Sequence, residues 1–398
     1  MTKRPNDIGK SSRIRVCVVA PSLNILGGQC RQAARLLEGL RKEPMLEVSW
    51  LPHDPPLPGV LRKLQSIKYI RTILTTTLYL ITLFLRLPRY DVVHVFAASY
   101  YSYLLSVVPA ILIAKMYGKQ IIVNYRSGQA EDHLTNWRWT AVPTMRLADA
   151  IVVPSNYLVH VFARFGLEAR AIFNIVELDH FRFRERNPLR PVFLCSRLLE
   201  PLYNVGCVLR AFACIQRRYP EARLTIAADG PMRSELEQLA RELDLRHTRF
   251  IGRVPFHEMP SLYDHADIYL TASDLDNMPS SITESFASGV LVVTTNAGGI
   301  PYILTHEETG LMVRCGDHEA LAASAIRLLE DPELAARLAR NAAESARRFT
   351  WSAVRADWLS VYGELASLTA SLRRDLARDG EKSVNEIDYQ AAGSGKDS

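Results

Sequence analysis

The stretch that decides the fold is residues 268–289, IYLTASDLDNMPSSITESFASG. Its first residues, Ile268 to Thr271, are apolar, aromatic or β-branched, which predicts a short buried strand. The loop that follows contains Asp276, Asn277, Met278 and Pro279. A helix is then expected to start at Ser280 or Ser281, with Ser280 as its cap and Gly289 at its C-terminal stop.

This loop and helix start have features of a site for phosphate and sugar. The loop follows a predicted parallel strand, where open α/β sheets bind ligands, and free amide groups at a helix start attract phosphate. Two carboxylates, Asp276 and Glu284, lie on either side of the helix start. A carboxylate accepts hydrogen bonds from paired sugar hydroxyls. The spacing alone also fits an ordinary capped helix with incidental acids, so both interpretations stay open here.

Strands and helices alternate along the rest of the chain. Further strands are predicted at Arg15–Ala20, Val92–Phe96, Ile121–Tyr125, Ile151–Pro154, Pro191–Ser196, Leu224–Ala228, Arg249–Ile251 and Val290–Thr294. Helices are predicted at Gln29–Leu40, Val205–Arg218, Met232–Leu243, Met259–His265, Ser281–Ser288 and Glu319–Leu329. Alternation of this kind predicts an α/β fold with parallel sheets and crossover helices.

The length of the chain and the restart of this pattern predict two lobes. A chain of 398 residues exceeds the size at which one hydrophobic core keeps growing. We expect an N-terminal lobe at 1–180, a C-terminal lobe at 181–350, a final helix at 351–376 that joins the first lobe, and a disordered polar tail at 377–398.

Composition restricts the class of protein. The six cysteines lie among apolar neighbours without a CxxC or Cys/His cluster, which predicts reduced core residues and no metal site. The polar N-terminus lacks the apolar core of a signal peptide, so we expect a cytoplasmic protein. The net charge of +6 is modest. Basic residues stand beside acids, as in Arg233, Glu235 and Glu237, which argues against a nucleic-acid-binding protein.

The segment Leu61 to Arg89 has an uncharged, largely apolar core, Ile73 to Leu85, between basic flanks. This core is shorter than the roughly 20 residues of a membrane-spanning helix, so no span is predicted. Two interpretations stay open. The segment is either an interfacial helix attracted to anionic lipid, on the inner face of the membrane, or a packing helix of the first lobe with snorkelling basic ends.

Several motifs occur in an order that resembles a known family. They are VAPSLNILGGQCRQAARLLEGL, YDVVHVF, ADAIVVPSNY, AADGP, FIGRVP, ADIYLTASD, ESFASG, TNAGGIP and TGLMV. Together they resemble the retaining glycosyltransferase family 4 over roughly residues 13–365. The resemblance implies a GT-B fold, which has two Rossmann-like lobes with a cleft between them. It also implies sugar transfer from a UDP- or GDP-sugar to a glycan or lipid-linked acceptor, with retention and without a metal or other cofactor.

The resemblance also implies roles for individual residues. Glu284 would hold the nucleotide ribose, Asp276 the hydroxyls of the transferred sugar, and Arg197 the diphosphate, for which a guanidinium has bidentate geometry. The other residues implied at the donor are Gly27, Gly28, Gly230, Gly252, Asn277, Met278, Pro279, Ser280 and Ser281.

Three positions depart from the family pattern. Asp276 stands where the family usually has Glu, and Tyr203 stands where it usually has a phosphate-binding Lys. Arg126 stands where many members have a His near the reacting centre, and it could neutralise phosphate or bind an anionic acceptor. His133 or Asp132 nearby could supply another polar contact. We include Tyr203 among the donor-binding residues and Arg126 among the catalytic ones.

Two rival functions were weighed. Two Rossmann-like units suggest a dinucleotide-dependent dehydrogenase, but no GxGxxG follows a strand in this sequence. A non-catalytic nucleotide-sugar-binding protein at the membrane stays open as the alternative to the transferase.

Overall fold

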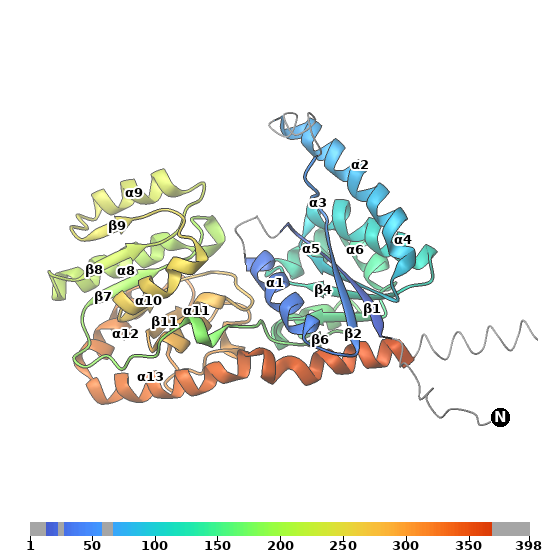
Figure 1. Cartoon of the computed structure of the whole chain (residues 1–398). Helices are drawn as coiled ribbons and strands as arrows, with labels where there is room; N and C mark the ends of the chain where they lie inside the picture. The colour runs from blue at the N-terminus through green and yellow to red at the C-terminus, as the bar shows by residue number, and fades with distance from the viewer. Residues whose placement is uncertain (1–12, 23–27, 58–66, 368–398) are drawn as a thin grey trace, which may run out of the picture.

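The structure is a computed structural model that describes residues 13–22, 28–57 and 67–367. It has two lobes, each built on a parallel six-stranded sheet with helices around it (Figure 1). The predicted α/β fold with two Rossmann-like lobes is therefore confirmed. The expected tail at 377–398 lies outside the described residues.

The first sheet has the strand order β2-β1-β3-β4-β5-β6. Its strands are β1 (Ile14–Ala20), β2 (Leu46–Pro52), β3 (Val92–Ala97), β4 (Gln120–Tyr125), β5 (Ala150–Val153) and β6 (Arg170–Ala171). Its helices are α1 (Gly28–Arg41), α2 (Lys68–Arg86), η2 (Leu87–Arg89), α3 (Tyr100–Ser102), η3 (Tyr103–Val107), α4 (Val108–Met116), α5 (Ala130–Asn136), α6 (Arg138–Met145) and α7 (Asn156–Ala163).

The second sheet has the strand order β12-β11-β10-β7-β8-β9. Its strands are β7 (Val192–Cys195), β8 (Arg223–Ile226), β9 (Thr248–Phe250), β10 (Ile268–Leu270), β11 (Leu291–Thr295) and β12 (Leu311–Val313). Its helices are η4 (Leu178–His180), η5 (Pro201–Tyr203), α8 (Val205–Arg218), α9 (Arg233–Glu242), η6 (Phe256–Glu258), α10 (Met259–His265), α11 (Ser280–Ser288), η7 (Ile300–Tyr302), α12 (His318–Glu330), α13 (Pro332–Ala346) and η8 (Arg347–Phe349).

The strand order of the second sheet places a ligand site. The chain moves outward from β7 to β9 and then returns to pair β10 with the other side of β7. Open α/β sheets bind ligands beyond the carboxyl ends of the two strands at such a reversal. Here those ends lead into Arg197 and into the loop at Asp276. The fold alone thus brings these two predicted residues to one edge.

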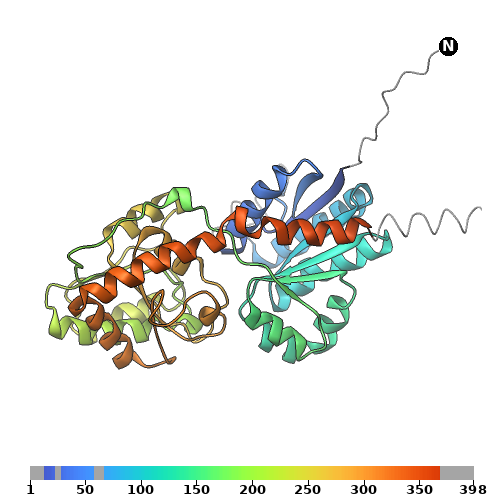
Figure 2. The same cartoon turned by 90° about the horizontal axis from the view of Figure 1, so that it is seen from below.

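Two segments join the lobes. A connector, residues 172–191, runs from β6 to β7. Residues 351–367 form a helix that crosses back from α13 and lies against the first lobe, as Figure 2 shows from below. Trp358 and Tyr362 of this helix are fully buried in a core that also contains Val16 of β1.

His94 on β3 anchors this helix through a buried hydrogen-bond chain. Its Nδ1 is 2.6 Å from the Tyr362 hydroxyl, and its Nε2 is 2.9 Å from Nδ2 of Asn124. Burial lowers the pKa of His94 to about 3. His133 is also fully buried, and burial lowers its pKa to about 4. Both rings are therefore neutral in the folded protein.

We expect the two buried histidines to make stability fall as the pH falls from 7 to 5. An unfolded histidine takes up a proton near pH 6.5, whereas these two stay neutral when folded, so the unfolded state binds more protons in this range. For each histidine, the free energy of unfolding can fall by at most about 1.4 kcal/mol per pH unit. Replacing His94 with Gln should reduce this slope in urea unfolding, and replacing the exposed His257 should not. An unchanged slope in His94→Gln would contradict the expectation.

Helix α2 packs on the first lobe with one face only. Tyr79 and Leu83 are fully buried, and the Tyr79 hydroxyl donates to the Ser106 carbonyl at 2.7 Å. The inner face thus packs as a helix of the first lobe would. The outer face leaves Ile73 66% exposed and Leu85 68% exposed. This helix therefore has both a packed side and an apolar side open to solvent.

The argument from length against a membrane-spanning helix was wrong. Among the described residues, Tyr69–Arg89 is one helix of 21 residues, long and apolar enough to cross a membrane by length and composition. The helix continues beyond the uncharged core in both directions because its basic flanks are also helical. Length therefore does not by itself exclude a membrane-spanning helix.

The cysteine prediction holds with one exception. All six are unpaired, and Cys17, Cys30, Cys195 and Cys207 are buried. Cys214 is half-buried, whereas Cys315 is exposed, so the prediction of a core residue was wrong for Cys315. Its loop follows the edge strand β12, where the chain leaves the core.

Candidate functional site

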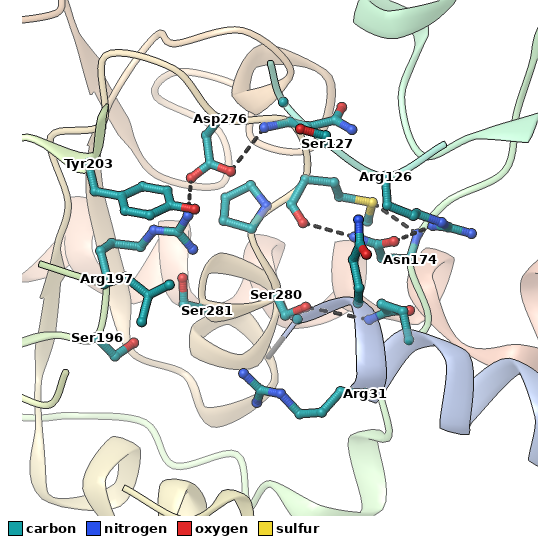
Figure 3. A pocket seen from close by; sticks show the side chains of 18 of the residues that line it. Arg31, Arg126, Ser127, Asn174, Ser196, Arg197, Tyr203, Asp276, Ser280 and Ser281 are labelled. Atoms are coloured by element: carbon teal, nitrogen blue, oxygen red, sulfur yellow. Dashed lines mark hydrogen bonds and ion pairs between the residues drawn. The ribbon is translucent and has the colours of Figure 1, made fainter. Parts of the chain in front are cut away.

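A cavity of about 750 Å³ lies between the lobes and is lined by residues of both (Figure 3). Most of the predicted site residues line it. These are Gly28, Arg126, Arg197, Tyr203, Asp276, Asn277, Met278, Pro279, Ser280, Ser281 and Glu284. The cavity lies at the strand reversal of the second sheet, so the fold and the sequence motifs point to the same place.

The loop from Asp276 to Pro279 packs closely against the backbone of two glycines. The Gly299 amide donates to the Asp276 carbonyl at 2.9 Å. A side chain at Gly298 or Gly299 would come within about 2 Å of the loop carbonyls, so only glycine allows this approach. The glycines of the TNAGGIP motif therefore fix the position of the loop backbone at the cavity.

The same loop is also held by the first lobe and the connector. Asn174 of the connector donates from Nδ2 to the Met278 carbonyl at 2.9 Å. The Ser155 hydroxyl, just after β5, donates a hydrogen bond to Oδ1 of Asn277. These contacts leave the loop little freedom, which suits a site that must hold its ligand in one geometry.

Helix α11 begins at the cavity, although not with the predicted cap. Pro279 occupies the N-cap position and no side chain caps the helix, so the assignment of Ser280 as the cap was wrong. Ser280 is instead the first helical residue, because Pro279 already sets the extended backbone of a cap. Ser280 and Ser281 line the cavity, and their first-turn amides have no helical carbonyl to bond. Gly289 ends the helix with a φ of 70°, as predicted.

Arg197 and Asp276 form an ion pair in the cavity. Nη2 of Arg197 is 2.6 Å from Oδ2 of Asp276. Burial is the largest single effect and lowers the pKa of Arg197, but Asp276 acts together with Tyr203, Tyr269 and Cys195 to raise the pKa overall. The Nε of Arg197 is buried without a hydrogen-bond partner. The guanidinium thus stays charged and keeps donor capacity for a ligand.

Tyr203 supports Arg197 from its position in η5. The Arg197 guanidinium lies 4.1 Å from the centre of the Tyr203 ring, within the range of a cation–π contact. Figure 3 shows the ring beside the guanidinium. Tyr203 therefore orients the cation, and supplies no charge where the family usually has Lys.

Glu284 lies on α11 with its carboxylate almost fully buried. The Tyr263 hydroxyl donates to Oε2 at 3.1 Å. Oε1 faces two guanidiniums of α1, with Arg31 Nη1 and Arg35 Nη2 each 3.7 Å away. Burial raises the pKa of Glu284, and the two arginines oppose that shift. The carboxylate is thus held rigidly on one side and has an oxygen without a hydrogen bond on the other.

Arg126 lies at the end of β4 among neutral partners. Its Nε donates to Oδ1 of Asn124, and its Nη1 donates to Oδ1 of Asn174. Burial lowers the pKa of Arg126 to about 9. The guanidinium therefore brings a positive charge to the first-lobe wall of the cavity, held by amides.

The two other polar candidates beside Arg126 have different positions. His133 is fully buried, with Nδ1 3.0 Å from the Tyr125 hydroxyl, and does not line the cavity. Asp132 is exposed and accepts a hydrogen bond from the Tyr100 hydroxyl. Of these two, His133 is a packing residue, since aromatic rings surround it.

Comparisons with known proteins bear on the family and the fold. Residues 178–345 match the model of the family glycosyl transferases group 1. The matched residues lie almost entirely in the second lobe and make up less than half of the chain. Among solved structures, the fold is similar to HepE of Anabaena, with a TM-score of 0.70 and 16% identity over 88% of this chain and 100% of that one. Sucrose-phosphate synthase of Thermosynechococcus elongatus also has a TM-score of 0.70, at 19% identity over 89% of this chain and 100% of that one.

Curated relatives of this chain include enzymes whose names contain a phosphatidylinositol mannoside or an inositol phosphate. A GDP-mannose-dependent alpha-(1-6)-phosphatidylinositol monomannoside mannosyltransferase of Mycolicibacterium smegmatis is 28% identical over 50% of this chain and 59% of its own length. A D-inositol 3-phosphate glycosyltransferase of Saccharomonospora viridis is 30% identical over 54% of this chain and 56% of its own length. The chain thus spans a little over half the length of these relatives.

Two of the glycines predicted at the donor do not line the cavity, and a third cannot be placed. Gly27 lies outside the described residues. Gly230 packs against the Leu199 backbone, and Gly252 lies in a turn with a φ of 77°. Neither borders the cavity, because Ala227, Ala228 and Arg253 line that side instead.

The sequence analysis missed Arg31, Arg35 and Asn174. Arg31 and Asn174 line the cavity, and Arg35 contacts Glu284. The sequence contained a signal for the two arginines. Residues four apart on a helix share one face, and this helix directly follows the Gly28 motif. In the described residues no group of three His, Cys, Asp or Glu side chains is placed to hold a metal ion.

Proposed function

We propose that this protein is a group 1 glycosyltransferase that transfers a sugar from a UDP- or GDP-sugar to a glycan or lipid-linked acceptor, with retention and without a metal. One observation carries the proposal. Glu284, the Arg197–Asp276 pair and the first-turn amides of α11 converge in one cavity between the lobes. This set offers a carboxylate for ribose, a cation and amides for a diphosphate, and a second carboxylate for a sugar.

In this proposal the donor diphosphate lies against Arg197 and the start of α11. The guanidinium stabilises the negative charge that grows on the diphosphate as the sugar leaves, which is the main task of a preorganised cation in such a reaction. Asp276 holds hydroxyls of the sugar while it stays paired with Arg197. Ser280 and Ser281 supply further donors from their amides. The two lobes exclude water from the reacting bond.

The acceptor would enter from the side of the first lobe. Arg126 brings a positive charge to that wall, and its partners are neutral amides. A cation so placed favours an acceptor with a phosphate or carboxylate. The curated relatives whose names include a phosphorylated inositol or an inositol lipid support this choice.

A donor panel tests the proposed activity. The protein is incubated with UDP- and GDP-sugars and with anionic lipid-linked or glycan acceptors, and both transfer and hydrolysis are measured. Turnover with at least one donor is expected, with a product whose anomeric configuration matches the donor by NMR. The opposite anomer would refute retention. Thermal stabilisation by a nucleotide sugar without turnover would favour the non-catalytic alternative.

We also propose that the first lobe contacts an anionic membrane peripherally, at the cytoplasmic face. Helices α2 and α4 lie next to each other on this lobe (Figure 1). Their exposed apolar side chains include Ile73, Ile81, Phe84, Leu85, Leu112 and Met116. The exposed Arg71, Arg86 and Arg89 lie on or beside α2. Apolar side chains with basic neighbours favour the surface of a membrane that contains anionic lipid.

Flotation with vesicles tests this contact. The protein should float with vesicles that contain phosphatidylglycerol, and much less with neutral phosphatidylcholine vesicles, because charge and apolar burial act together. The double variant Ile73→Glu and Leu85→Glu should lose most of the floated fraction. Ile251→Glu, at an exposed apolar residue of the second lobe, is the matched control. A wild-type protein that stays at the bottom of the gradient would refute the contact.

A further inference from the structure

Helix α1 of the first lobe carries two arginines that face the second lobe. Arg31 and Arg35 are four residues apart and share one face of the helix. Their guanidiniums lie 5.2 and 5.0 Å from the centre of the Phe256 ring. Figure 3 shows Arg31 reaching from α1 toward the second lobe near Ser280. The ring therefore positions both cations beside α11.

Both arginines point at Glu284 without a hydrogen bond to it. Each has a guanidinium nitrogen 3.7 Å from Oε1 of the carboxylate. This distance exceeds that of an N–H···O hydrogen bond. Oε1 of Glu284 and Nη2 of Arg35 are both buried without a hydrogen-bond partner. A buried donor and a buried acceptor thus face each other across a gap.

A bound hydroxyl group would bridge these two atoms by displacing the groups that cover them in this structure. An oxygen about 2.8 Å from the carboxylate oxygen and about 2.9 Å from a guanidinium nitrogen forms a triangle whose third side can be 3.7 Å. A hydroxyl at that point donates to Glu284 and accepts from the arginine, so it satisfies both groups. A carboxylate or a fully ionised phosphate could not do this, because neither has a proton to donate to Glu284.

We propose that Arg31 and Arg35 complete a ribose site shared by the two lobes, in which a ribose hydroxyl lies between Glu284 and the α1 guanidiniums. This inference rests on the proposed function, since it assumes a nucleotide donor. A ribose has two neighbouring hydroxyls, so one of them can bridge to α1 while both remain near the carboxylate. The nucleoside then links the lobes directly.

Arg35 is the fixed half of this site. Its Nε is 2.9 Å from Glu177, and its Nη1 donates to the Ile175 carbonyl at 2.8 Å, so it is tied to the connector. Arg31 is 39% exposed and lines the cavity. Replacing Arg31 therefore tests the site without removing the anchor of the connector.

The experiment is titration calorimetry of the full chain with UDP and GDP and with their 2′-deoxy and 3′-deoxy analogues. Wild type should prefer the better ribonucleotide over at least one deoxy analogue by tenfold or more. Arg31→Met, which keeps the apolar stem over Phe256, should bind that ribonucleotide about tenfold more weakly and lose most of this preference. Arg41→Met, at the exposed end of α1, should behave like wild type.

The outcomes separate this inference from the proposed function. If Arg31→Met keeps the full preference for ribose, the shared site is refuted while nucleotide binding stands. If Arg31→Met binds the ribonucleotide more tightly, Arg31 only competes for Glu284 and the inference is again overturned. If wild type binds neither UDP nor GDP, the proposed function fails and the shared site fails with it.

Discussion

Replacing Arg197 with Ala should lower the rate of sugar transfer by about 10²–10³, because loss of one preorganised group that stabilises transition-state charge has an effect of that size. Steady-state kinetics with saturating donor should show the loss mainly in kcat. Tyr203 cannot substitute, since its ring carries no positive charge. Arg210→Ala, at an exposed arginine of α8 outside the cleft, should leave the rate unchanged.

The Arg197 variant needs a second measurement. Without its cation, the buried Asp276 carboxylate would be left unpaired, which destabilises a fold. The double variant Arg197→Ala and Asp276→Asn removes that charge. Its thermal stability should recover relative to Arg197→Ala, while its transfer rate should stay well below that of Asp276→Asn alone. A rate that recovers with stability would show that Arg197 holds the loop in place and does not stabilise the leaving diphosphate.

Replacing Glu284 with Gln should weaken binding of the nucleoside diphosphate about 30- to 100-fold. A hydrogen bond from a ligand hydroxyl to a charged acceptor contributes roughly 1.5–3 kcal/mol, and glutamine keeps the shape of the side chain without the charge. Titration calorimetry measures the effect, with Glu319→Gln on the exposed side of α12 as control. Affinity within threefold of wild type would remove Glu284 from the donor site.

The central strands could be predicted from the sequence because each is buried on both faces. β3, β4 and β11 are buried along their whole length, so each contains a run of apolar and β-branched residues. The strands that were missed, β2, β6 and β12, all lie at sheet edges. An edge strand such as β2 is half exposed and shows no such run. An edge strand is therefore recognised only from its pairing with the neighbouring strand in the structure.

The donor half of the site was predictable because its residues are close in sequence. Asp276, the helix start and Glu284 fall within nine positions, and a local motif can show them. Arg31 is 253 positions from Glu284, and the two meet only when the lobes come together. The assignment of Ser280 as a cap failed for a local reason, since Pro279 had already taken the cap position. Contacts between the lobes, such as that of Arg31 with Glu284, thus cannot be predicted from local motifs.

The helix at 351–367 has a consequence for the order in which the protein can fold. Trp358, Val361, Tyr362 and Leu365 complete the core around β1 and β3, although they are synthesised after the entire second lobe. During translation the first lobe therefore emerges with an open apolar groove that is filled only when the last helix leaves the ribosome. A chain that stops before residue 351 would present it permanently.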